Sequence, residues 1–339
     1  MSTIVLTGGG TAGHIIPNLA LLDELRQYFD NIHYIGGEGM EKEMVSKENI
    51  PFHSTKNIKF DRMKWSKNLQ IPIVIGQGTM EAKKLLTSIN PDIIFSKGGF
   101  VSLPTCFAAK MKKIPIVIHE SDYTLGLANK VVAPFAQKVL TSFPETEKGK
   151  FVGNPIRDII TKGNKENIIA DLDINPNKKT ILIFGGSLGS EAINNTIYKG
   201  IKELCYKYNV VHISGKSGDF QIHNKNYNQL NFVDNIQDYY NLCDCVISRA
   251  GANSLAEIAS LGLHSIAIPL PSGNSRGDQL DNAKSYQNRG FSDILLQEEL
   301  FVESLIYKID NIWDKPTKKL DCKNINKSIV DEIIDTLKS

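Results

Sequence analysis

Several features that would decide the class of this protein are missing from its sequence. The cysteines are few, and their odd number and irregular spacing exclude a disulfide framework and favour a reducing compartment: Cys106, Cys205, Cys243, Cys245 and Cys322. No stretch approaches the roughly 18 uncharged apolar residues of a membrane span. The N-terminus also lacks the basic and apolar regions of a signal peptide. We therefore expect neither a leader nor a membrane-spanning helix, although contact with a membrane surface stays open.

An excess of charge of one sign is also missing. The chain has 39 basic and 37 acidic side chains, so its formal net charge is +2. This balance predicts no general attraction to polyanions, and nucleic acid is not an expected partner. Zinc-ligand spacing is absent as well, because no second cysteine or histidine pair follows Cys243 and Cys245. We interpret these two cysteines as small buried hydrophobic residues.

What the sequence does contain is an alternation of short β-branched runs and amphipathic segments, which is typical of parallel strands joined by helices. The clearest expected strands are 3–6, 32–35, 93–96, 116–119 and 138–142, and then 180–184, 210–214, 231–233, 245–248 and 265–269. At about 150 residues per domain, the length predicts two domains of this α/β class. We place the linker in the polar stretch 158–179. The expected domains are therefore 1–158 and 159–323, followed by a C-terminal helix within 324–339 that packs back on either of them.

Glycine-rich turns follow three of the expected strands. The first, Gly8–Gly10, leads into a helix whose first turn is expected to contain Pro17. Similar turns lie at 98–99 and at 185–190. Glycine lets the backbone approach a ligand closely, and the first amides of the following helix then point at it. Each turn is therefore a candidate site for an anion or a carbonyl group.

One Gly-x-Gly-x-x-Gly pattern, here Gly8, Gly10 and Gly13, also occurs in nicotinamide oxidoreductases. Those enzymes place an acidic residue about twenty residues after the loop, where it holds the adenosine ribose. The acidic residue that follows the second expected strand is Glu38, roughly thirty residues after Gly8. The fit to that class is therefore poor, but this alternative stays open. Two domains with such loops are a more specific signal than a single loop.

Seven motifs, in order along both domains, resemble the MurG group of glycosyltransferase family 28: Gly9-Gly10-Thr11-Ala12-Gly13-His14, Gly98-Gly99-Phe100-Val101-Ser102-Leu103-Pro104, His119-Glu120 with Asn129, Gly153-Asn154-Pro155-Ile156-Arg157, Gly185-Gly186-Ser187, Arg249-Ala250-Gly251-Ala252 with Glu257, and Gly277-Asp278-Gln279 with Asn282-Ala283. The resemblance implies the GT-B fold, in which two Rossmann-like, doubly wound parallel-sheet domains face each other across a cleft. It also implies an inverting sugar transfer that uses no metal and no other cofactor.

The resemblance further implies the two substrates. The donor is UDP-N-acetylglucosamine (UDP-GlcNAc). The acceptor is the 4-hydroxyl of N-acetylmuramic acid (MurNAc) in undecaprenyl-pyrophosphoryl-MurNAc-pentapeptide (lipid I), and the product, lipid II, serves peptidoglycan synthesis. The implied location is the cytoplasmic face of the bacterial membrane, where the protein binds peripherally.

The resemblance assigns the UDP-GlcNAc site mainly to the C-terminal domain. Glu257 resembles a family carboxylate that accepts hydrogen bonds from both ribose hydroxyls, unless it is a solvated helix residue. Ser187 and the helix start Ala252-Asn253-Ser254 would face the pyrophosphate. Val233 would read the uracil edge through its backbone, and Gln279 would hold hydroxyls of the transferred sugar. The remaining expected donor contacts are Thr11, Ala12, Gly13, Asp122 and Arg157, the last of which is alternatively an interdomain salt bridge.

Three residues are candidates for catalysis. His14, in the first turn of a helix whose positive end favours a neutral ring, is either the general base or only a binder of the acceptor. His119 and Glu120 close a strand at the carboxyl edge, where either could orient the acceptor or act as the base. Asp122 could do the same, and His119 could be structural. The expected acceptor contacts are Gly10, Gly98, Gly99, Phe100, Asn129 and Asn194, although helix capping or core hydrogen bonding explains the two asparagines as well.

Three positions depart from the family pattern. Ala12 replaces a glycine, Phe100 replaces a common tyrosine, and Asp278 stands where some members carry a second glutamine. The triplet Asp171-Leu172-Asp173 has the Asp-x-Asp form used by metal-dependent glycosyltransferases. Because it lies in the polar linker, we interpret it as surface charge and expect no metal.

Aromatic and basic residues alternate in the stretch 56–86, a pattern that anchors a surface to anionic lipid headgroups. Its members are Phe60, Met63 and Trp65 with Lys56, Lys59, Arg62, Lys64 and Lys67. A second basic cluster is Lys110, Lys112 and Lys113. We expect both clusters beside the acceptor site, and the alternative is a solvated loop ahead of a core helix.

Other functions stay open from the sequence alone. One is a transferase that glycosylates diacylglycerol or another lipid, against which the Thr-Ala-Gly-His, His-Glu and Gly-Asn-Pro-Ile-Arg motifs argue. A second is a UDP-sugar epimerase, which would release free sugar without a lipid. The third is a UDP-sugar-binding protein without turnover.

Overall fold

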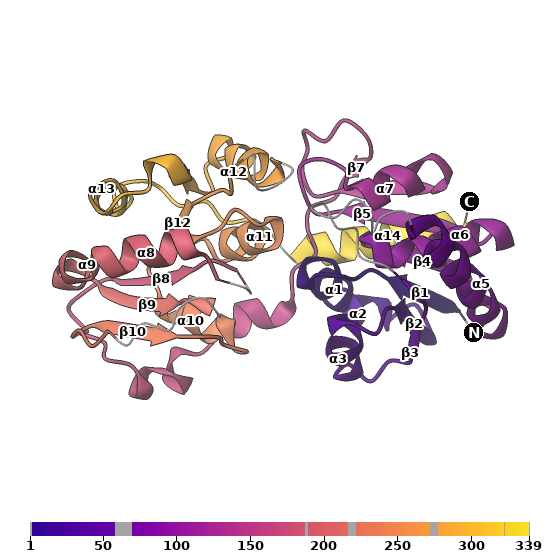
Figure 1. Ribbon diagram of the computed structural model, residues 1–339, viewed down its shortest axis with the longest axis horizontal. Helices are drawn as coiled ribbons and strands as arrows, with labels where there is room; N and C mark the ends of the chain where they lie inside the picture. The colour runs from indigo at the N-terminus through magenta and orange to yellow at the C-terminus, as the bar shows by residue number, and fades with distance from the viewer. Residues whose placement is uncertain are drawn as a thin grey trace. The chain divides into compact units, whose positions relative to one another are not determined.

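The chain forms two compact units. The computed structural model describes residues 2–57, 70–186, 189–215, 222–271, 277–321 and 323–338 (Figure 1). Unit 1 consists of Met1–Arg157 together with Cys322–Ser339, and unit 2 of Asp158–Asp321. The polar stretch at the start of unit 2 forms three short 3-10 helices, Asp158–Lys162, Lys165–Asn167 and Ile169–Asp171.

Unit 1 is built around a seven-stranded parallel sheet. In spatial order its strands are β3 (Phe52–Ser54), β2 (Asn31–Gly36), β1 (Thr3–Thr7), β4 (Ile93–Ser96), β5 (Ile116–Glu120), β6 (Lys138–Thr141) and β7 (Lys150–Phe151). The central strands are buried throughout, because helices cover both faces of a parallel sheet. The helices are α1 (Ala12–Leu19), α2 (Leu22–Leu25), α3 (Met40–Ser46), α5 (Ile71–Ile89), α6 (Leu103–Lys112), α7 (Leu127–Val132) and α14 (Lys323–Lys338).

Unit 2 repeats this plan with six parallel strands. Their spatial order is β10 (Tyr227–Leu230), β9 (Asn209–Ile213), β8 (Thr180–Phe184), β11 (Cys245–Ser248), β12 (His264–Ala267) and β13 (Asp293–Ile294). The β-branched residues of β8 and β11 lie in the buried core of the unit. The covering helices are α8 (Glu191–Lys199), α9 (Ile201–Lys207), α10 (Ile236–Leu242), α11 (Ala252–Leu261), α12 (Asp278–Asn288) and α13 (Val302–Asp310).

Both sheets have the doubly wound strand order, which runs outward in both directions from a central pair. The central pair is β1 with β4 in unit 1 and β8 with β11 in unit 2. Where the order reverses, the loops that follow the two central strands diverge to opposite faces of the sheet and leave a crevice at the carboxyl edge. The glycine loops at 8–13 and 98–99 flank this point in unit 1, and those at 185–190 and 249–252 flank it in unit 2.

The fold class predicted from the sequence, a two-domain α/β protein with doubly wound parallel sheets, is confirmed. Three details were wrong. The strand expected at 231–233 lies at Tyr227–Leu230, since pairing with β9 rather than local composition defines it. Pro17 is not in the first turn, because α1 already begins at Ala12. The short edge strands β3, β7 and β13 were not predicted.

The described cysteines are buried and the two aspartates of the Asp-x-Asp triplet are exposed, as the sequence predicted for Cys243, Cys245 and the triplet. Cys243 and Cys245 are buried and unpaired, as are Cys106 and Cys205, while Cys322 lies outside the described residues. Asp171 and Asp173 are exposed, and the carboxylate of Asp173 accepts a hydrogen bond from the backbone of Asn226 at 3.0 Å. In the described part of the chain no helix has the length and apolarity to cross a bilayer.

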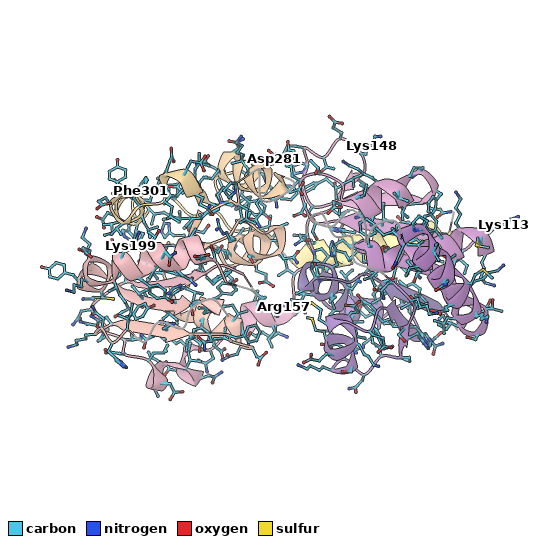
Figure 2. The ribbon with its side chains drawn as sticks, viewed as in Figure 1. Lys113, Lys148, Arg157, Lys199, Asp281 and Phe301 are labelled. Carbon is cyan, nitrogen blue, oxygen red and sulfur yellow. The ribbon has the colours of Figure 1, made fainter. Side chains whose placement is uncertain are left out.

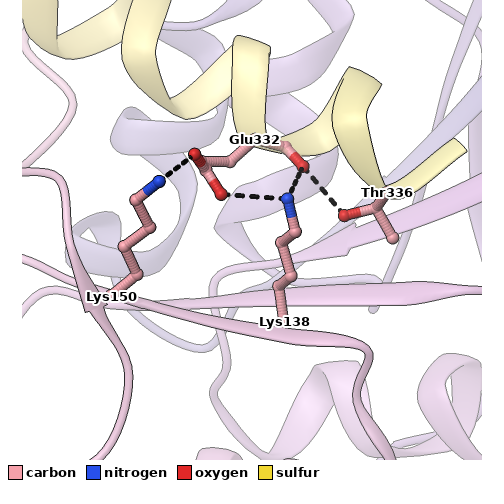
Figure 3. A network of polar contacts seen from close by, with 4 residues as sticks. All are labelled: Lys138, Lys150, Glu332 and Thr336. Carbon is pink, nitrogen blue, oxygen red and sulfur yellow. Dashed lines mark hydrogen bonds and ion pairs between the residues drawn. The ribbon is translucent and has the colours of Figure 1, made fainter. Parts of the chain in front are cut away.

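The C-terminal helix α14 belongs to unit 1, and polar contacts hold it there (Figure 3). Glu332, which is 7% exposed, accepts hydrogen bonds from Lys138 Nζ at 2.9 Å and Lys150 Nζ at 2.5 Å. Near the start of the helix, the Asn326 amide bonds both backbone groups of Ile156, at 3.1 and 2.8 Å. The helix thereby fixes the Gly153–Ile156 segment, which carries one of the sequence motifs.

Replacing Glu332 by Gln should loosen α14. Burial opposes ionisation of Glu332, but hydrogen bonds from Lys150 and Lys138 outweigh it and hold its pKa below the ordinary value of 4.5. A lowered carboxylate pKa stabilises the fold at pH values above about 4.5, and this contribution is lost as the pH falls further. We expect hydrogen exchange of the α14 amides to show a loss of about 1–3 kcal/mol at pH 7, and a smaller difference from the native protein below pH 4.5.

The matched control is Glu38→Gln. Glu38 pairs with Lys42 at 2.7 Å, but both side chains are more than half exposed, so the change should leave the exchange of the α14 amides unaltered. Equal exchange rates in the two variants would contradict the role given to Glu332.

Candidate functional site

In unit 1 the two glycine loops at the β1–β4 crevice touch each other. A Cβ built on Gly99 would lie 2.4 Å from the carbonyl oxygen of Gly9 and 3.3 Å from Nδ1 of His14. Gly99 has a φ of +78°, a backbone conformation that only glycine adopts without strain. His14 is half-buried in the first turn of α1, and its Nδ1 lies 2.9 Å from the hydroxyl of Thr11. The structure therefore brings together the expected residues Gly10, Thr11, Ala12, Gly13, His14, Gly98 and Gly99.

Sequence reasoning missed the polar residues that brace the first loop. The carboxylate of Glu41 is 2% exposed and accepts from the backbone of Gly37 at 3.0 Å and, more weakly, of Gly10 at 3.5 Å. On the other side, the Tyr34 hydroxyl donates to the carbonyl of Gly8 at 2.8 Å and accepts from Asn18 at 3.1 Å. Tyr34 on β2 and Glu41 on α3 thus fix the loop, an arrangement that appears only once β2 is paired with β1.

His119 is buried completely, and the structure engages both of its ring nitrogens. Nε2 lies 2.8 Å from the carbonyl oxygen of Gly153, and Nδ1 contacts Nζ of Lys97. Because a carbonyl oxygen only accepts, Nε2 carries the hydrogen and Nδ1 the lone pair. Burial, and next the nearby Lys97, lower the pKa of His119 well below its usual 6.5. This geometry favours the structural alternative for His119 over its role as a base.

Glu120 organises the loop that follows β5. One carboxylate oxygen accepts from the backbone of Asp122 at 3.1 Å, and the other from the backbone of Gly126 at 2.7 Å and the side chain of Asn129 at 2.8 Å. Asn129 also donates to the carbonyl of His119 at 3.2 Å, and its oxygen lies beside Gly98. Glu120 and Asn129 therefore support the loops around His14, with Phe100 half-buried on the adjoining 3-10 turn.

Asn194 belongs to unit 2, whereas the other expected acceptor residues belong to unit 1. Its amide donates to the carbonyl of Ser214 at 2.9 Å, and its oxygen lies 3.0 Å from Nε2 of His212. Burial lowers the pKa of His212 to about 4, so this ring is neutral at pH 7. The contacts favour the core hydrogen-bonding interpretation of Asn194.

In unit 2, helix starts and glycines surround the β8–β11 crevice. Gly186 and Gly189 have positive φ values of +92° and +81°. Ser190 then caps α8 by accepting from the backbone of Ile193 at 3.5 Å. Ala252, Asn253 and Ser254 form the first turn of α11, whose amides point out of the helix start. Ser187 lies outside the described residues.

The expected sugar and ribose contacts follow on α11 and α12. Glu257 is 9% exposed, which disagrees with a solvated helix glutamate. The Gln279 carbonyl accepts from the backbone of Leu270 at 3.1 Å, so its amide nitrogen is the group that can donate to a ligand. Asp278 begins α12 and is buried. Asn282 donates to the carbonyl of Ala250 at 3.2 Å and so ties α12 to the start of α11.

Arg249 belongs to one of the seven sequence motifs, but the sequence predicted no role for its guanidinium, which is buried. It donates to Ser190 Oγ at 2.7 Å, to Gln297 Oε1 at 2.6 Å and to the carbonyls of Ile268 and Pro269 at 3.2 and 3.3 Å. Burial lowers its pKa, but arginine stays charged at neutral pH. All four acceptors are neutral, so Arg249 leaves a net positive charge between the loops of β8, β11 and β12.

Two further expected contacts lie in connecting segments. Val233 is half-buried in the loop between β10 and α10. Arg157 is half-buried and ends the main segment of unit 1 (Figure 2).

Comparison with known proteins assigns the family. Residues 4–141 match the model of the glycosyltransferase family 28 N-terminal domain, and residues 180–337 match that of its C-terminal domain. A curated relative from Clostridium perfringens is 42% identical over 99% of this chain and 97% of its own length. The chain belongs to glycosyltransferase family 28. The family predicted from the motifs is thereby confirmed.

Two curated relatives carry the same name. The Clostridium perfringens protein is named UDP-N-acetylglucosamine--N-acetylmuramyl-(pentapeptide) pyrophosphoryl-undecaprenol N-acetylglucosamine transferase. A relative from Clostridium tetani with the same name is 39% identical over 98% of this chain and 97% of its own length.

Solved structures agree with the family 28 fold. MurG from Acinetobacter baumannii superposes with a TM-score of 0.75 over 99% of this chain and 100% of its own, at 23% identity. UDP-GlcNAc 2-epimerase from Neisseria meningitidis, bound to UDP-GlcNAc, superposes with a TM-score of 0.66 over 99% and 100%, at 16% identity. At these identities the likeness concerns the fold alone, so the epimerase gives no support to an epimerase activity in this family 28 chain.

Replacing Gly99 by Ala should separate the two glycine loops of unit 1. The new Cβ cannot lie 2.4 Å from the Gly9 oxygen, and the positive φ adds strain of about 1–3 kcal/mol. We expect sugar transfer to fall at least about tenfold, since a displacement of reacting groups by about 1 Å lowers rates strongly. Binding of UDP, which the motif resemblance assigns to unit 2, should stay unchanged by calorimetry.

Gly290→Ala is the matched control, because Gly290 also has a φ of +78° but lies after α12 against the flexible end of Lys318. It should lower the melting temperature without lowering transfer. Normal transfer by the Gly99 variant would show that the loop contact is not needed.

Proposed function

We propose that this chain transfers GlcNAc from UDP-GlcNAc to the 4-hydroxyl of MurNAc in lipid I, which gives lipid II for peptidoglycan synthesis. The observation that carries this proposal is the identity of 42% over 99% of the chain to a transferase of that name. The site supports it independently, because the helix starts, Arg249 and Glu257 of unit 2 have the chemistry that binds a nucleoside diphosphate.

The donor binds to unit 2 in this proposal. Both ribose hydroxyls donate to the carboxylate of Glu257, and the uracil edge meets the backbone of Val233. The diphosphate lies against the glycine loop with Ser187 and against the first turn of α11, where the helix dipole stabilises negative charge. Arg249 adds a fixed positive charge near the same loops. These groups take up the charge of the departing diphosphate, so the step needs no metal.

The reaction is a single displacement. The 4-hydroxyl oxygen forms a bond to the anomeric carbon as the bond from that carbon to the diphosphate oxygen breaks, and the electron pair leaves with UDP. The hydroxyl proton passes to a general base. An attack from the side opposite the leaving group inverts the anomeric configuration. Gln279, through its amide nitrogen, holds a hydroxyl of the transferred sugar.

His14 is the residue that we propose as the base. In the tautomer in which Nδ1–H donates to Thr11, Nε2 carries the lone pair that accepts the proton. His119 and Glu120 are less suited, because His119 is buried with both nitrogens engaged and Glu120 already accepts three hydrogen bonds. They hold the loops that present the acceptor to His14.

Replacing Glu257 by Ala should abolish tight UDP binding. Two hydrogen bonds to a charged group, each about 1.5–3 kcal/mol, disappear, so we expect the Kd for UDP to rise by at least about a hundredfold. Glu257→Gln, which keeps one acceptor oxygen, should lose less. Calorimetry with UDP measures both effects.

Transfer itself is tested with labelled UDP-GlcNAc and a short-chain lipid I analogue, with EDTA present throughout. We expect a lipid II product that persists in EDTA. Free sugar released without lipid would indicate an epimerase, a product only with diacylglycerol would indicate a glycolipid synthase, and UDP binding without any product would indicate a binding protein.

The same proposal places unit 1 on an anionic membrane surface at the cytoplasmic face. Of the residues expected to do this, those from Lys59 to Lys67 lie outside the described ones. Lys56 is exposed and lies 3.8 Å from the carboxylate of Glu81 on α5, and this helix supports the idea. Ile73 is 65% exposed and Met80 is 53% exposed on α5. Exposed apolar side chains beside basic residues are typical of surfaces that insert shallowly into lipid.

The second basic cluster, which we expected beside the acceptor site, does not lie beside the Gly98–Gly99 loop. Helix α6 begins just after Gly98–Gly99 and runs ten residues, or about 15 Å, away from it. Lys110, Lys112 and Lys113 therefore lie at the opposite edge of the sheet, and Figure 2 labels Lys113 there. Lys112 donates to Thr87 near the end of α5.

Vesicle sedimentation tests the membrane surface. Binding to vesicles with anionic lipid should exceed binding to neutral vesicles. Reversing the charges of Lys59, Arg62 and Lys64 together should weaken it by at least about 3 kcal/mol, at roughly 1 kcal/mol for each base. The control with both Lys110 and Lys113 changed to Glu, at the far edge, should bind nearly normally. Equal binding to both lipids, or equal losses in both variants, would exclude this surface.

A further inference from the structure

Lys97 is a buried lysine that the proposed mechanism does not use. It follows β4 directly and is 1% exposed. Its backbone donates to the carbonyl of Thr7 at 3.0 Å, and its Cβ lies 3.3 Å from the position of a Cβ on Gly8. Lys97 therefore lies in the β1–β4 crevice, beneath both glycine loops of unit 1.

The amine of Lys97 contacts two neutral groups. Nζ donates to Ser121 Oγ at 2.8 Å and to Nδ1 of His119. Within the described part of the chain, no carboxylate forms an ion pair with it. Glu120 and Asp122 favour its charge from a distance, but burial dominates and lowers the pKa of Lys97 to about 7. Such burial is unfavourable, and an apolar residue of similar length would fill the same space without this cost.

An apolar residue could not donate the hydrogen bonds that join Lys97 to His119 and Ser121. By donating to Nδ1, Lys97 selects the tautomer in which His119 Nε2–H bonds the carbonyl of Gly153. Ser121, which accepts from Lys97, donates in turn to Asn154 Oδ1 at 2.8 Å. Both branches end in the Gly153–Asn154 segment, so the amine of Lys97 connects the start of the loop after β4 and the residues after β5 with the segment that α14 holds.

We propose that Lys97 is a positioning residue for the lipid acceptor, which acts by fixing the His119 tautomer and the Ser121–Asp122 loop beneath the glycine loops. This inference rests on the proposed function. Lys97 itself does not reach the reacting atoms, because it is enclosed by the residues it orients.

Kinetics of Lys97→Met test the proposal. Methionine matches the length of the lysine stem and removes only the donors. We expect kcat/KM for the lipid I analogue to fall by a factor of ten to a hundred, and the KM for UDP-GlcNAc to stay within twofold, because the donor contacts belong to unit 2. Lys112→Met is the control: it removes a lysine of unit 1 that donates to Thr87, away from the glycine loops, and it should transfer normally.

A spectroscopic measurement on the unaltered protein covers the case in which Lys97→Met does not fold. With 15N-labelled histidine, and the His119 signals assigned by their loss in His119→Gln, the ring should carry its proton on Nε2 and should not titrate between pH 6 and 8. In Lys97→Met the second tautomer should appear. A His119 ring protonated on Nδ1, or one that titrates in this range, would overturn the proposal.

The outcomes separate the two claims. If the unaltered protein transfers no sugar, the proposed function fails, whereas the tautomer measurement still judges the contact of Lys97 with His119. If it transfers and Lys97→Met keeps its kcat/KM for the acceptor, the positioning role is wrong while the function stands.

Discussion

All the chemistry of this chain depends on one constraint of parallel sheets: strands that run the same way end at the same edge. In each unit the strand order reverses at a central pair, β1 with β4 and β8 with β11, so the loops after these strands diverge and leave backbone amides exposed. Glycine is required there because the loops approach each other closely, as the 2.4 Å from a Gly99 Cβ to the Gly9 oxygen illustrates. The sites are therefore consequences of topology, and the side chains only decide what is bound.

The two units use this geometry with opposite electrostatics. In unit 2 the guanidinium of Arg249 has only neutral acceptors, so the crevice between the β8 and β11 loops gains positive charge and suits a diphosphate. In unit 1 the buried carboxylates of Glu41 and Glu120 accept from the backbone amides of Gly37 and Gly126. These acidic groups fix the surrounding loops, which is consistent with the acceptor role proposed for unit 1.

Much of the fold could be predicted because its central strands have a distinct local sequence. A short apolar run rich in β-branched residues, such as Thr180–Phe184, is stable as a strand buried between two layers of helices. Tyr227–Leu230 escaped prediction because pairing with β9, not composition, makes it a strand. The glycine loops and His14 were predictable for the same local reasons. Lys97 was not, since its burial against His119 and Ser121 needs β4 and β5 to be adjacent, and no local pattern encodes that pairing.

The two histidines at the carboxyl edge of unit 1 show why residue type alone does not assign a base. His119 ends β5, inside the sheet, where a carbonyl and an amine hold both nitrogens and burial keeps the ring neutral. His14 lies on the first turn of α1, half-buried, with a hydroxyl against Nδ1. A base must gain a proton and lose it again within each turnover. Protonation of His119 would turn Nδ1 into a donor and break the buried hydrogen bond from Lys97, so this ring resists that cycle, whereas a ring at the edge of the fold can hand its proton to solvent. The same burial that disqualifies His119 as a base makes it a rigid support for the loops around His14.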